Sequence, residues 1–362
     1  MSSPSARALV IHSFVAFALV GAAQALYGPS VPALARLHDI LPSQAGAIVW
    51  AHAAGGFAGL LLNMVWAGVT ARRTLAVVAL GAGVMALAPS WAAMLAGAVL
   101  VGAGSALASA VFNRRFLEEL GDSGPRMLGL LNALFGVGAV VGPLIFVAAG
   151  GGIAPAYGAV AVLALILSAL APGGVPAGAP AARPRLGAVL RRPGLLALGG
   201  LGVGVELTLA GLGPAALVER GMSETRAALW AAVFFGVFLA ARVALWWLAD
   251  RIAPLRLLAA SFALVALACG AAALGVQGPA YALSGGAVAL LFPAYFVAAT
   301  RRLGGGERMA ALIVAAGYLG ATVVPGVMSL LLGRLGIEML FAATIPLALL
   351  GAAGALAARA QD

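Results

Sequence analysis

The sequence contains no lysine, one cysteine and few charged residues of any kind. Charged side chains make up 9% of its 362 residues, whereas about a quarter is usual for a soluble domain. Because 63% of the residues are hydrophobic, we infer an all-α integral membrane protein. The single cysteine, Cys269, excludes an internal disulfide. With only three dispersed histidines besides, we expect no metal site and no cofactor.

What the sequence does contain is a series of long apolar segments. About 20 such residues are needed to cross a bilayer as a helix. Ala23-Gln24-Ala25 resembles a signal-peptide cleavage site, but the apolar run continues beyond it, so we expect this segment to be retained. We predict twelve spans, at 8–35, 45–70, 74–89, 91–117, 127–150, 154–172, 194–219, 227–249, 253–274, 278–300, 309–332 and 336–358.

The arginines predict the orientation of these spans. If both termini are cytoplasmic, sixteen arginines fall in the inner segments and four in the outer ones, as the positive-inside rule requires. The inner sixteen are Arg7, Arg72, Arg73, Arg114, Arg115, Arg126, Arg183, Arg185, Arg191, Arg192, Arg251, Arg256, Arg301, Arg302, Arg308 and Arg359. The outer four are Arg36, Arg220, Arg226 and Arg334. This placement accounts for the net charge of +10 without a nucleic-acid partner.

The two halves of the chain resemble each other. "GAVVGP" at 138–143 recurs as "GATVVP" at 320–325, and the pair Arg126-Met127 recurs as Arg308-Met309. Because six spans are an even number, both repeats have the same orientation. We predict a first bundle at 1–172, a cytoplasmic Pro- and Gly-rich linker at 173–193, and a second bundle at 194–362.

These features, with "ARVALWWLADRI" at 241–252, resemble the major facilitator superfamily. "YGPSVPAL", "GLLNALFGVGAVVGPL" (129–144), "GVGVELTLAG" (202–211) and "LLFPAYF" (290–296) are most similar to its fucose/glucose/galactose–proton symporter group. The resemblance implies the major facilitator fold and sugar–proton symport. In the first-half loop, Gly68 stands where the superfamily usually has Asp. Gly28 and Ser109 replace the carboxylates of helices one and four, so that coupling route is not implied.

One acid, Glu206, lies inside the apolar run from Leu195 to Val218. An unpaired charge in hydrocarbon costs several kcal/mol, so an acid kept there is a functional site by default. At about 1.5 Å per residue, it is roughly 18 Å along its helix and near the midplane. We expect Glu206 to carry a proton or to accept a hydrogen bond from a sugar hydroxyl. The alternative is a structural acid, neutral or paired with Arg242.

Arg242 has two equally weighted interpretations. It contacts the solute or Glu206, or it extends toward the loop that contains Asp250. We expect the loop residues to stabilise one conformation rather than to contact solute. The predicted gating residues are Arg72, Arg73, Asp250 and Arg251.

Uncharged polar and aromatic side chains recur across the predicted spans. Amides and hydroxyls suit the hydroxyls of a sugar, and aromatic faces suit its C–H side. For each residue the alternative is interhelical hydrogen bonding or interfacial anchoring. His52 is interpreted as a packed, hydrogen-bonded residue. With Arg242, the predicted solute-binding residues are Gln24, Tyr27, Asn113, Asn132, Phe235, Tyr295 and Tyr318.

The sequence therefore predicts a secondary transporter of a small polar solute, a sugar in the leading interpretation, coupled to protons through Glu206. The alternative is an exporter of sugars or amphipathic compounds in the same fold. The sequence contains no nucleophile–base motif and no phosphate loop, so we do not expect an enzyme. We expect a monomer in a bacterial cytoplasmic membrane, whose partners are the solute, protons and the lipid bilayer.

Overall fold

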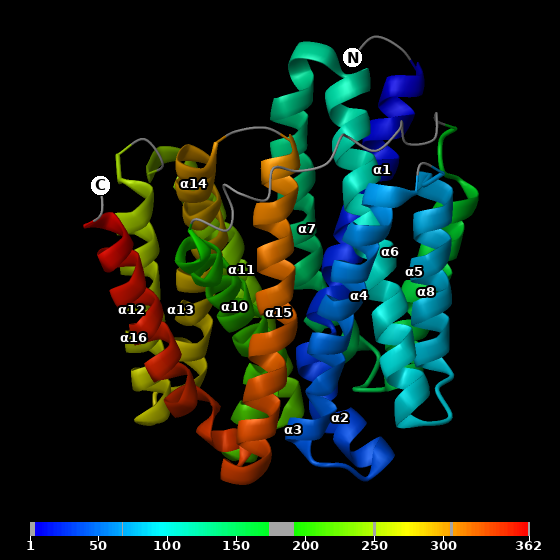
Figure 1. Ribbon diagram of the computed structural model, residues 1–362. Coiled ribbons are helices and arrows are strands. Elements are labelled where there is room, and N and C mark those ends of the chain that lie inside the picture. Colours follow the sequence, from blue (N-terminus) through cyan, green and yellow to red (C-terminus); the bar gives the residue numbers. More distant parts are fainter. Residues whose placement is uncertain (1–3, 67, 174–191, 249–250, 305–306, 361–362) are drawn as a thin grey trace.

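The computed structural model describes residues 4–66, 68–173, 192–248, 251–304 and 307–360 (Figure 1). Every regular element in these ranges is a helix, which confirms the predicted all-α class. The first half contains α1 (Pro4–Ala25), α2 (Tyr27–His38), α3 (Pro42–Ala45), α4 (Ala47–Val65), α5 (Ala71–Ala86), α6 (Trp91–Glu119), α7 (Gly124–Ala148) and α8 (Ile153–Ala169). The second half contains α10 (Pro193–Glu219), α11 (Glu224–Leu248), α12 (Pro254–Ala273), α13 (Gln277–Ala289), α14 (Leu291–Leu303), α15 (Glu307–Leu335) and α16 (Leu340–Arg359).

Each of the twelve predicted spans corresponds to one helix or to two consecutive helices. Ten segments are long and apolar enough to cross a membrane. The other two are α5 and α8, with 16 and 17 residues. Most of the linker, at 174–191, lies outside the described residues, as does Asp250.

Proline divides the first and tenth spans. A proline ring clashes with the carbonyl of the fourth residue before it. For Pro29 that residue is Ala25, where α1 ends, and for Pro293 it is Ala289, where α13 ends. At the first junction the Leu26 carbonyl accepts hydrogen bonds from both the backbone N–H of Ser30, at 3.2 Å, and the Ser30 hydroxyl, at 2.7 Å.

The third span begins earlier than the sequence predicts, at Ala71 rather than at residue 74. Thr70 explains the shift because its hydroxyl accepts a hydrogen bond from the backbone N–H of Arg73, at 3.4 Å, and so caps the helix. Both arginines of this loop therefore lie in the first turn of α5. Ser90 caps α6 in the same way, with Ala93 as the donor.

The packing of the first half is repeated in the second. In the first half α1 packs on α7, α4 on α6, and α5 on both α6 and α8. Six spans later, α10 packs on α15, α11 on α13, and α12 on both α13 and α16. Between the halves, α4 packs on α15 and α11 packs on α7, which is again a matched pair. The two repeats are thus parallel and share one internal topology.

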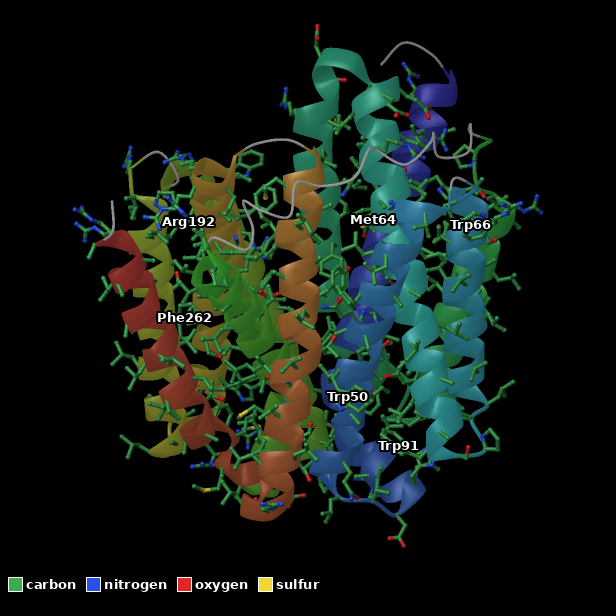
Figure 2. All side chains as sticks on the ribbon, in the orientation of Figure 1. Trp50, Met64, Trp66, Trp91, Arg192 and Phe262 are labelled. Atoms are coloured by element: carbon green, nitrogen blue, oxygen red, sulfur yellow. The ribbon has the colours of Figure 1, made fainter. Side chains whose placement is uncertain are left out.

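The two ends of the bundle differ. We call the end where α1 begins and α16 ends the terminal end, and the opposite end the distal end (Figure 1). Trp66 and Arg192 lie toward the terminal end, and Trp50 and Trp91 lie in the distal half (Figure 2). The arginine distribution predicts that the terminal end is cytoplasmic.

The halves contact each other most closely toward the distal end. There α2 packs on α10 and α11, and α3 packs on α15. Arg36 of α2 also forms a bidentate ion pair with Glu224, the first residue of α11. By contrast, α1, at the terminal end of the same span, packs on α6, α7 and α8 of its own half. The structure is therefore closed at the distal end.

Candidate functional site

Glu206 lies at the centre of α10, thirteen residues from either end of that helix. Its side chain is half-buried. Among the described residues it has no hydrogen bond and no direct ion pair. The other acids that the structure pairs lie near helix ends: Glu118 with Arg114, Glu119 with Arg115, and Glu224 with Arg36. Glu206 is thus an acid at the middle of its helix whose carboxyl oxygens are available to another partner.

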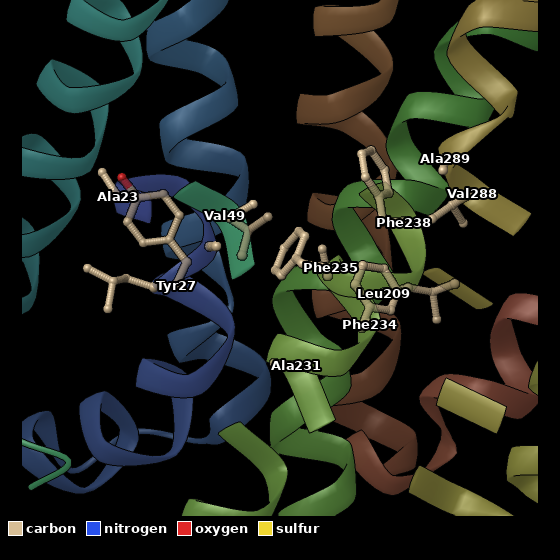
Figure 3. Close-up of a cluster of buried hydrophobic side chains, with 14 of the residues drawn as sticks. Ala23, Tyr27, Val49, Leu209, Ala231, Phe234, Phe235, Phe238, Val288 and Ala289 are labelled. Carbon is tan, nitrogen blue, oxygen red and sulfur yellow. The ribbon is translucent and has the colours of Figure 1, made fainter. Parts of the chain in front are cut away.

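The cation that interacts with Glu206 is Arg242 of α11. The Arg242 guanidinium lies over the Phe238 ring, 4.9 Å from its centroid. Phe238 contacts Phe235 at 6.4 Å between centroids, one turn farther along the same face of α11. In Figure 3, Phe235 points from α11 toward Val49 of α4, across the boundary between the halves. This face therefore presents two aromatic rings and one cation beside the acid.

Two contacts set the depth of Glu206 relative to the first half. The first is direct: Gly211 of α10 lies against the Val49 side chain of α4. Because these two helices run in opposite directions, Glu206, five residues before Gly211, is level with Ala54.

The second contact passes through α15, which runs in the same direction as α10. Gly204 lies against Val324, and Gly326 lies against the Trp50 ring. Glu206 is two residues after Gly204, and Gly326 is two residues after Val324, so Glu206 is level with Gly326 and therefore with Trp50 of α4. The two paths together bracket position 52, within about 3 Å at ~1.5 Å per residue.

Two polar first-half residues, Gln24 and His52, lie at about this depth. Gly28 of α2 lies against Ala210 and Pro214 of α10, so Gln24, four residues earlier, is nearly level with Glu206. Gln24 is half-buried and has no hydrogen bond to a described residue. Tyr27 is 2% exposed.

The Tyr27 hydroxyl is hydrogen-bonded to Nδ1 of His52 at 2.9 Å. The sequence predicts a packed, hydrogen-bonded His52, which agrees with this contact. Its depth places it with Gln24, Glu206 and Arg242, and we call these four residues the central layer. A lone histidine in an apolar helix carries no sequence signal that could have shown this.

Asn132 and Asn113 lie nearer the terminal end. Asn132 of α7 is exposed, yet it lies roughly opposite the exposed Leu130 and Val141 around the helix. Since those two apolar residues mark the lipid-facing side, Asn132 faces inward. Its amide nitrogen donates to the Leu128 carbonyl at 2.9 Å. Asn113 of α6 is half-buried, and its Oδ1 is buried without a hydrogen-bond partner.

The two predicted tyrosines of the second half are packed between helices. Tyr295 of α14 is fully buried, lies against Gly199 of α10, and donates to the Ile313 carbonyl at 3.4 Å. Tyr318 of α15 is half-buried and lies against Gly56 of α4. In this state Tyr318 contributes to the boundary between the halves, and Tyr295 to the core of the second half. Their roles in solute binding stay predictions.

Arg72, Arg73 and Arg251, three of the four residues predicted to control gating, lie at the terminal end (Figure 1), and Asp250 is outside the described residues. Arg73 donates to the Gly68 carbonyl at 2.6 Å, and its guanidinium lies 5.8 Å from the centroid of the Trp66 ring. The backbone of Gly68 thus binds the cation at the position where the superfamily usually supplies a carboxylate. Arg72 is exposed, and its carbonyl accepts from the Ser168 hydroxyl at 2.8 Å. Arg251 is exposed.

An apolar groove of about 650 Å³ lies between α4, α6 and α15 and extends from the depth of Trp50 toward the distal end. Trp50 and Trp91 line it, with Thr322 and Ser329 as polar members. Exposed Val327 and Leu330 at its edge place the groove on the lipid-facing side.

Comparison with known proteins gives a family match over most of the chain. The model of the Major Facilitator Superfamily matches residues 13–308. No curated protein matches the chain.

Solved transporters share the fold along almost their whole length. The Escherichia coli fucose:proton symporter is 19% identical, with 96% of this chain and 98% of that one covered and a TM-score of 0.61. A D-xylose–proton symporter is 14% identical over 96% of both chains, with a TM-score of 0.76. A bacterial homologue of the human lysosomal transporter Spinster, in an inward-facing and occupied conformation, is 16% identical. It covers 99% of this chain and 98% of its own, with a TM-score of 0.75.

Proposed function

The chain belongs to the major facilitator superfamily, and on that premise we propose that it carries a small polar solute, a sugar, by alternating access with proton coupling through Glu206. The observation that carries this proposal is the midplane position of Glu206, without a hydrogen bond or direct ion pair among the described residues. A charged acid at that depth costs several kcal/mol, so its presence there indicates a function. The sugar–proton symporters among the similar structures support the same class of solute.

The surroundings of Glu206 suit a sugar. Phe235 and Phe238 offer aromatic faces for the C–H side of a pyranose ring, and Gln24 offers amide donors and an acceptor at nearly the same depth. We propose that Arg242 alternates between the solute and Glu206. When Glu206 is protonated, the guanidinium is released to bind solute oxygens; when Glu206 is charged, the two attract each other. Binding of the solute and of the proton would then be linked.

The remaining predicted residues enter the proposal in two groups. Asn113 and Asn132 line the path toward the terminal end, and Tyr27, Tyr295 and Tyr318 contribute to the solute layer during the cycle. Arg72, Arg73, Asp250 and Arg251 control closure of the terminal end. The halves 1–172 and 194–362 move as two bodies joined by 173–193. We place the protein as a monomer in a bacterial cytoplasmic membrane, with both termini inside.

The first experiment identifies a solute. Purified protein is screened by thermal shift against monosaccharides, including D-xylose and L-fucose, because a bound ligand stabilises the folded state. A sugar that raises the melting temperature is then used for transport in proteoliposomes. If no sugar has an effect and amino acids or nucleosides do, the sugar assignment is wrong.

The second experiment tests the coupling role with Glu206→Gln, which keeps the shape and hydrogen bonding of the side chain. A potential of 100 mV supplies ~2.3 kcal/mol per charge, or about fiftyfold accumulation. The wild type should reach accumulation of this order, whereas Glu206→Gln should exchange solute without concentrating it. Glu219→Gln, exposed at the end of the same helix, is the matched control and should behave as wild type. Accumulation by Glu206→Gln vesicles acidified outside would contradict the proposal.

One observation favours the alternative, export of amphipathic compounds. The groove of about 650 Å³ is apolar, contains two tryptophans and faces lipid. Rhodamine 6G efflux from proteoliposomes tests this function. Efflux that Trp50→Ala reduces, together with no response to any sugar, would favour the exporter.

A further inference from the structure

His52 is a buried ring at the midplane that the proposed coupling mechanism does not use. It is 6% exposed. Its ring meets that of Tyr27 edge-on, with the centroids 5.1 Å apart. Tyr27 is itself held, because its ring stacks on Tyr157 at 6.2 Å, and the Tyr157 hydroxyl donates to Ser30 at 3.3 Å.

The two nitrogens of His52 have different surroundings. Nδ1 is hydrogen-bonded to the Tyr27 hydroxyl. Nε2 makes no hydrogen bond to a described residue, and it is not one of the buried polar atoms that lack a partner. It therefore keeps accessible surface, although the ring as a whole is buried. Of the two ring nitrogens of His52, Nε2 is therefore the one that a ligand can reach.

The helical position of His52 shows which way this atom is directed. Leu61, nine residues along α4, is exposed and lies on the opposite side of the helix. Since exposed leucines mark the lipid-facing side, His52 lies on the inward face. Gly56 and Asn63 share that face at helical spacing, and Asn63 Oδ1 is also buried without a hydrogen-bond partner. The inward face of α4 thus has unused hydrogen-bonding capacity.

We propose that His52 binds solute through Nε2–H and that Tyr27 is the positioning residue that fixes this tautomer. A neutral imidazole carries one donor and one acceptor. When the Tyr27 O–H donates to Nδ1, the ring proton is on Nε2, which then donates to an oxygen in the central layer. Because His52 is level with Glu206, a hydroxylated solute can bridge the two halves, with His52 on one side and Glu206 or Arg242 on the other. This inference rests on the proposed transport of a polar solute.

The transport test compares two amides with different reach. In His52→Gln the amide nitrogen falls near the position of Nε2, whereas in His52→Asn it falls near Nδ1. With whichever of D-xylose, L-fucose or D-glucose the wild type transports, His52→Asn should raise KM about tenfold and His52→Gln at most about threefold. Tyr27→Phe should raise KM about threefold and leave kcat unchanged. Equal KM values for the two amides, or a kcat loss with unchanged KM in Tyr27→Phe, would overturn the proposal.

A labelling test does not depend on the solute. In a Cys269→Ala background, a cysteine at position 52 should react with the water-soluble reagent MTSET, because the proposal places this position on the path of a water-soluble solute. A cysteine at position 61, on the lipid-facing side, is the matched control and should not react. Failure to label position 52 would overturn the proposal.

The tautomer itself is read by ¹⁵N NMR of histidine-labelled full-length protein, with His12 and His38 as internal references. We expect the protonated nitrogen of His52 to be Nε2 in the wild type, and the Nδ1 resonance to shift in Tyr27→Phe. A proton on Nδ1 in the wild type would overturn the assignment. If none of the three sugars is transported by the wild type, the assignment of solute class is at fault, and labelling with NMR still decides the role of His52.

Discussion

The ion pair between Arg36 and Glu224 should stabilise the distal-closed state. It joins the second helix of the first half to the first residue of α11, so it has to break when the distal ends separate. The Arg36 side chain is 62% exposed and that of Glu224 29%. Exposed pairs contribute about 0.2–1 kcal/mol. Because this pair has two hydrogen bonds, one of them 3.1 Å long, we expect a value near the upper limit, about 1 kcal/mol.

That free energy corresponds to about a fivefold change in the ratio of distal-closed to distal-open molecules. Arg36→Ala and Glu224→Ala should each produce this change, and the double variant should add little, because each single change already removes the whole pair. The populations are read from distance distributions measured by double electron–electron resonance between spin labels at Leu37 and Leu274. Both residues are exposed, and they belong to different halves. The labels are introduced in a Cys269→Ala background.

The charge-reversed double variant Arg36→Glu with Glu224→Arg provides the control. It should recover most of the wild-type distance distribution, whereas either reversal alone should shift it farther than alanine does. High salt should reduce the difference between the wild type and the alanine variants, since exposed charges are screened. Strictly additive single and double variants would refute the reasoning. An effect of the pair that salt leaves unchanged would do so as well.

Two further predictions concern orientation and the boundary between the halves. A cysteine at position 185 should be labelled by membrane-impermeant reagents only from the cytoplasmic side, and labelling only from outside would reverse the predicted orientation. Gly211→Val should lengthen the Leu37–Leu274 distances, because the new side chain collides with Val49 of the other half and the clash is relieved by separation. Gly236→Ala, where a Cβ meets nothing within 4 Å, should leave them unchanged; a lower melting temperature of Gly211→Val with unchanged distances would mean that the clash is absorbed within one half.

The sequence predicts the parts of this fold that depend on local chemistry. Apolar length locates the spans. Glu206 stands out because an acid in hydrocarbon is costly whatever surrounds it. Each of these follows from a residue and its near neighbours along the chain. The sequence does not predict the divisions near Pro29 and Pro293, because Pro143 and Pro214 lie inside continuous helices.

The relative depth of residues on different helices depends on packing and does not follow from the sequence. His52 and Glu206 are level only because particular glycines receive particular side chains, such as Val49 at Gly211. Both interpretations of Arg242 stay predictions: its guanidinium lies over the Phe238 ring and attracts Glu206 electrostatically, without a direct ion pair among the described residues. Tyr295 looks the same in sequence as a cavity tyrosine, but Gly199 leaves room for its ring within the second half.

The division of the first span at Leu26 also determines how strain is distributed when the halves separate. α1 packs on helices of the first half, whereas α2 packs on α10 and α11 of the second half and also on α4, α7 and α8 of its own. α2 therefore connects the two halves, and its contacts with α10 and α11 have to change when the distal ends separate. Separation of the distal ends acts on α2 first, and Leu26 connects α2 to α1 along the chain. Bending at Leu26 would reorient Tyr27, the first residue of α2. Because Tyr27 is hydrogen-bonded to His52, movement at the distal surface would then change the geometry around His52.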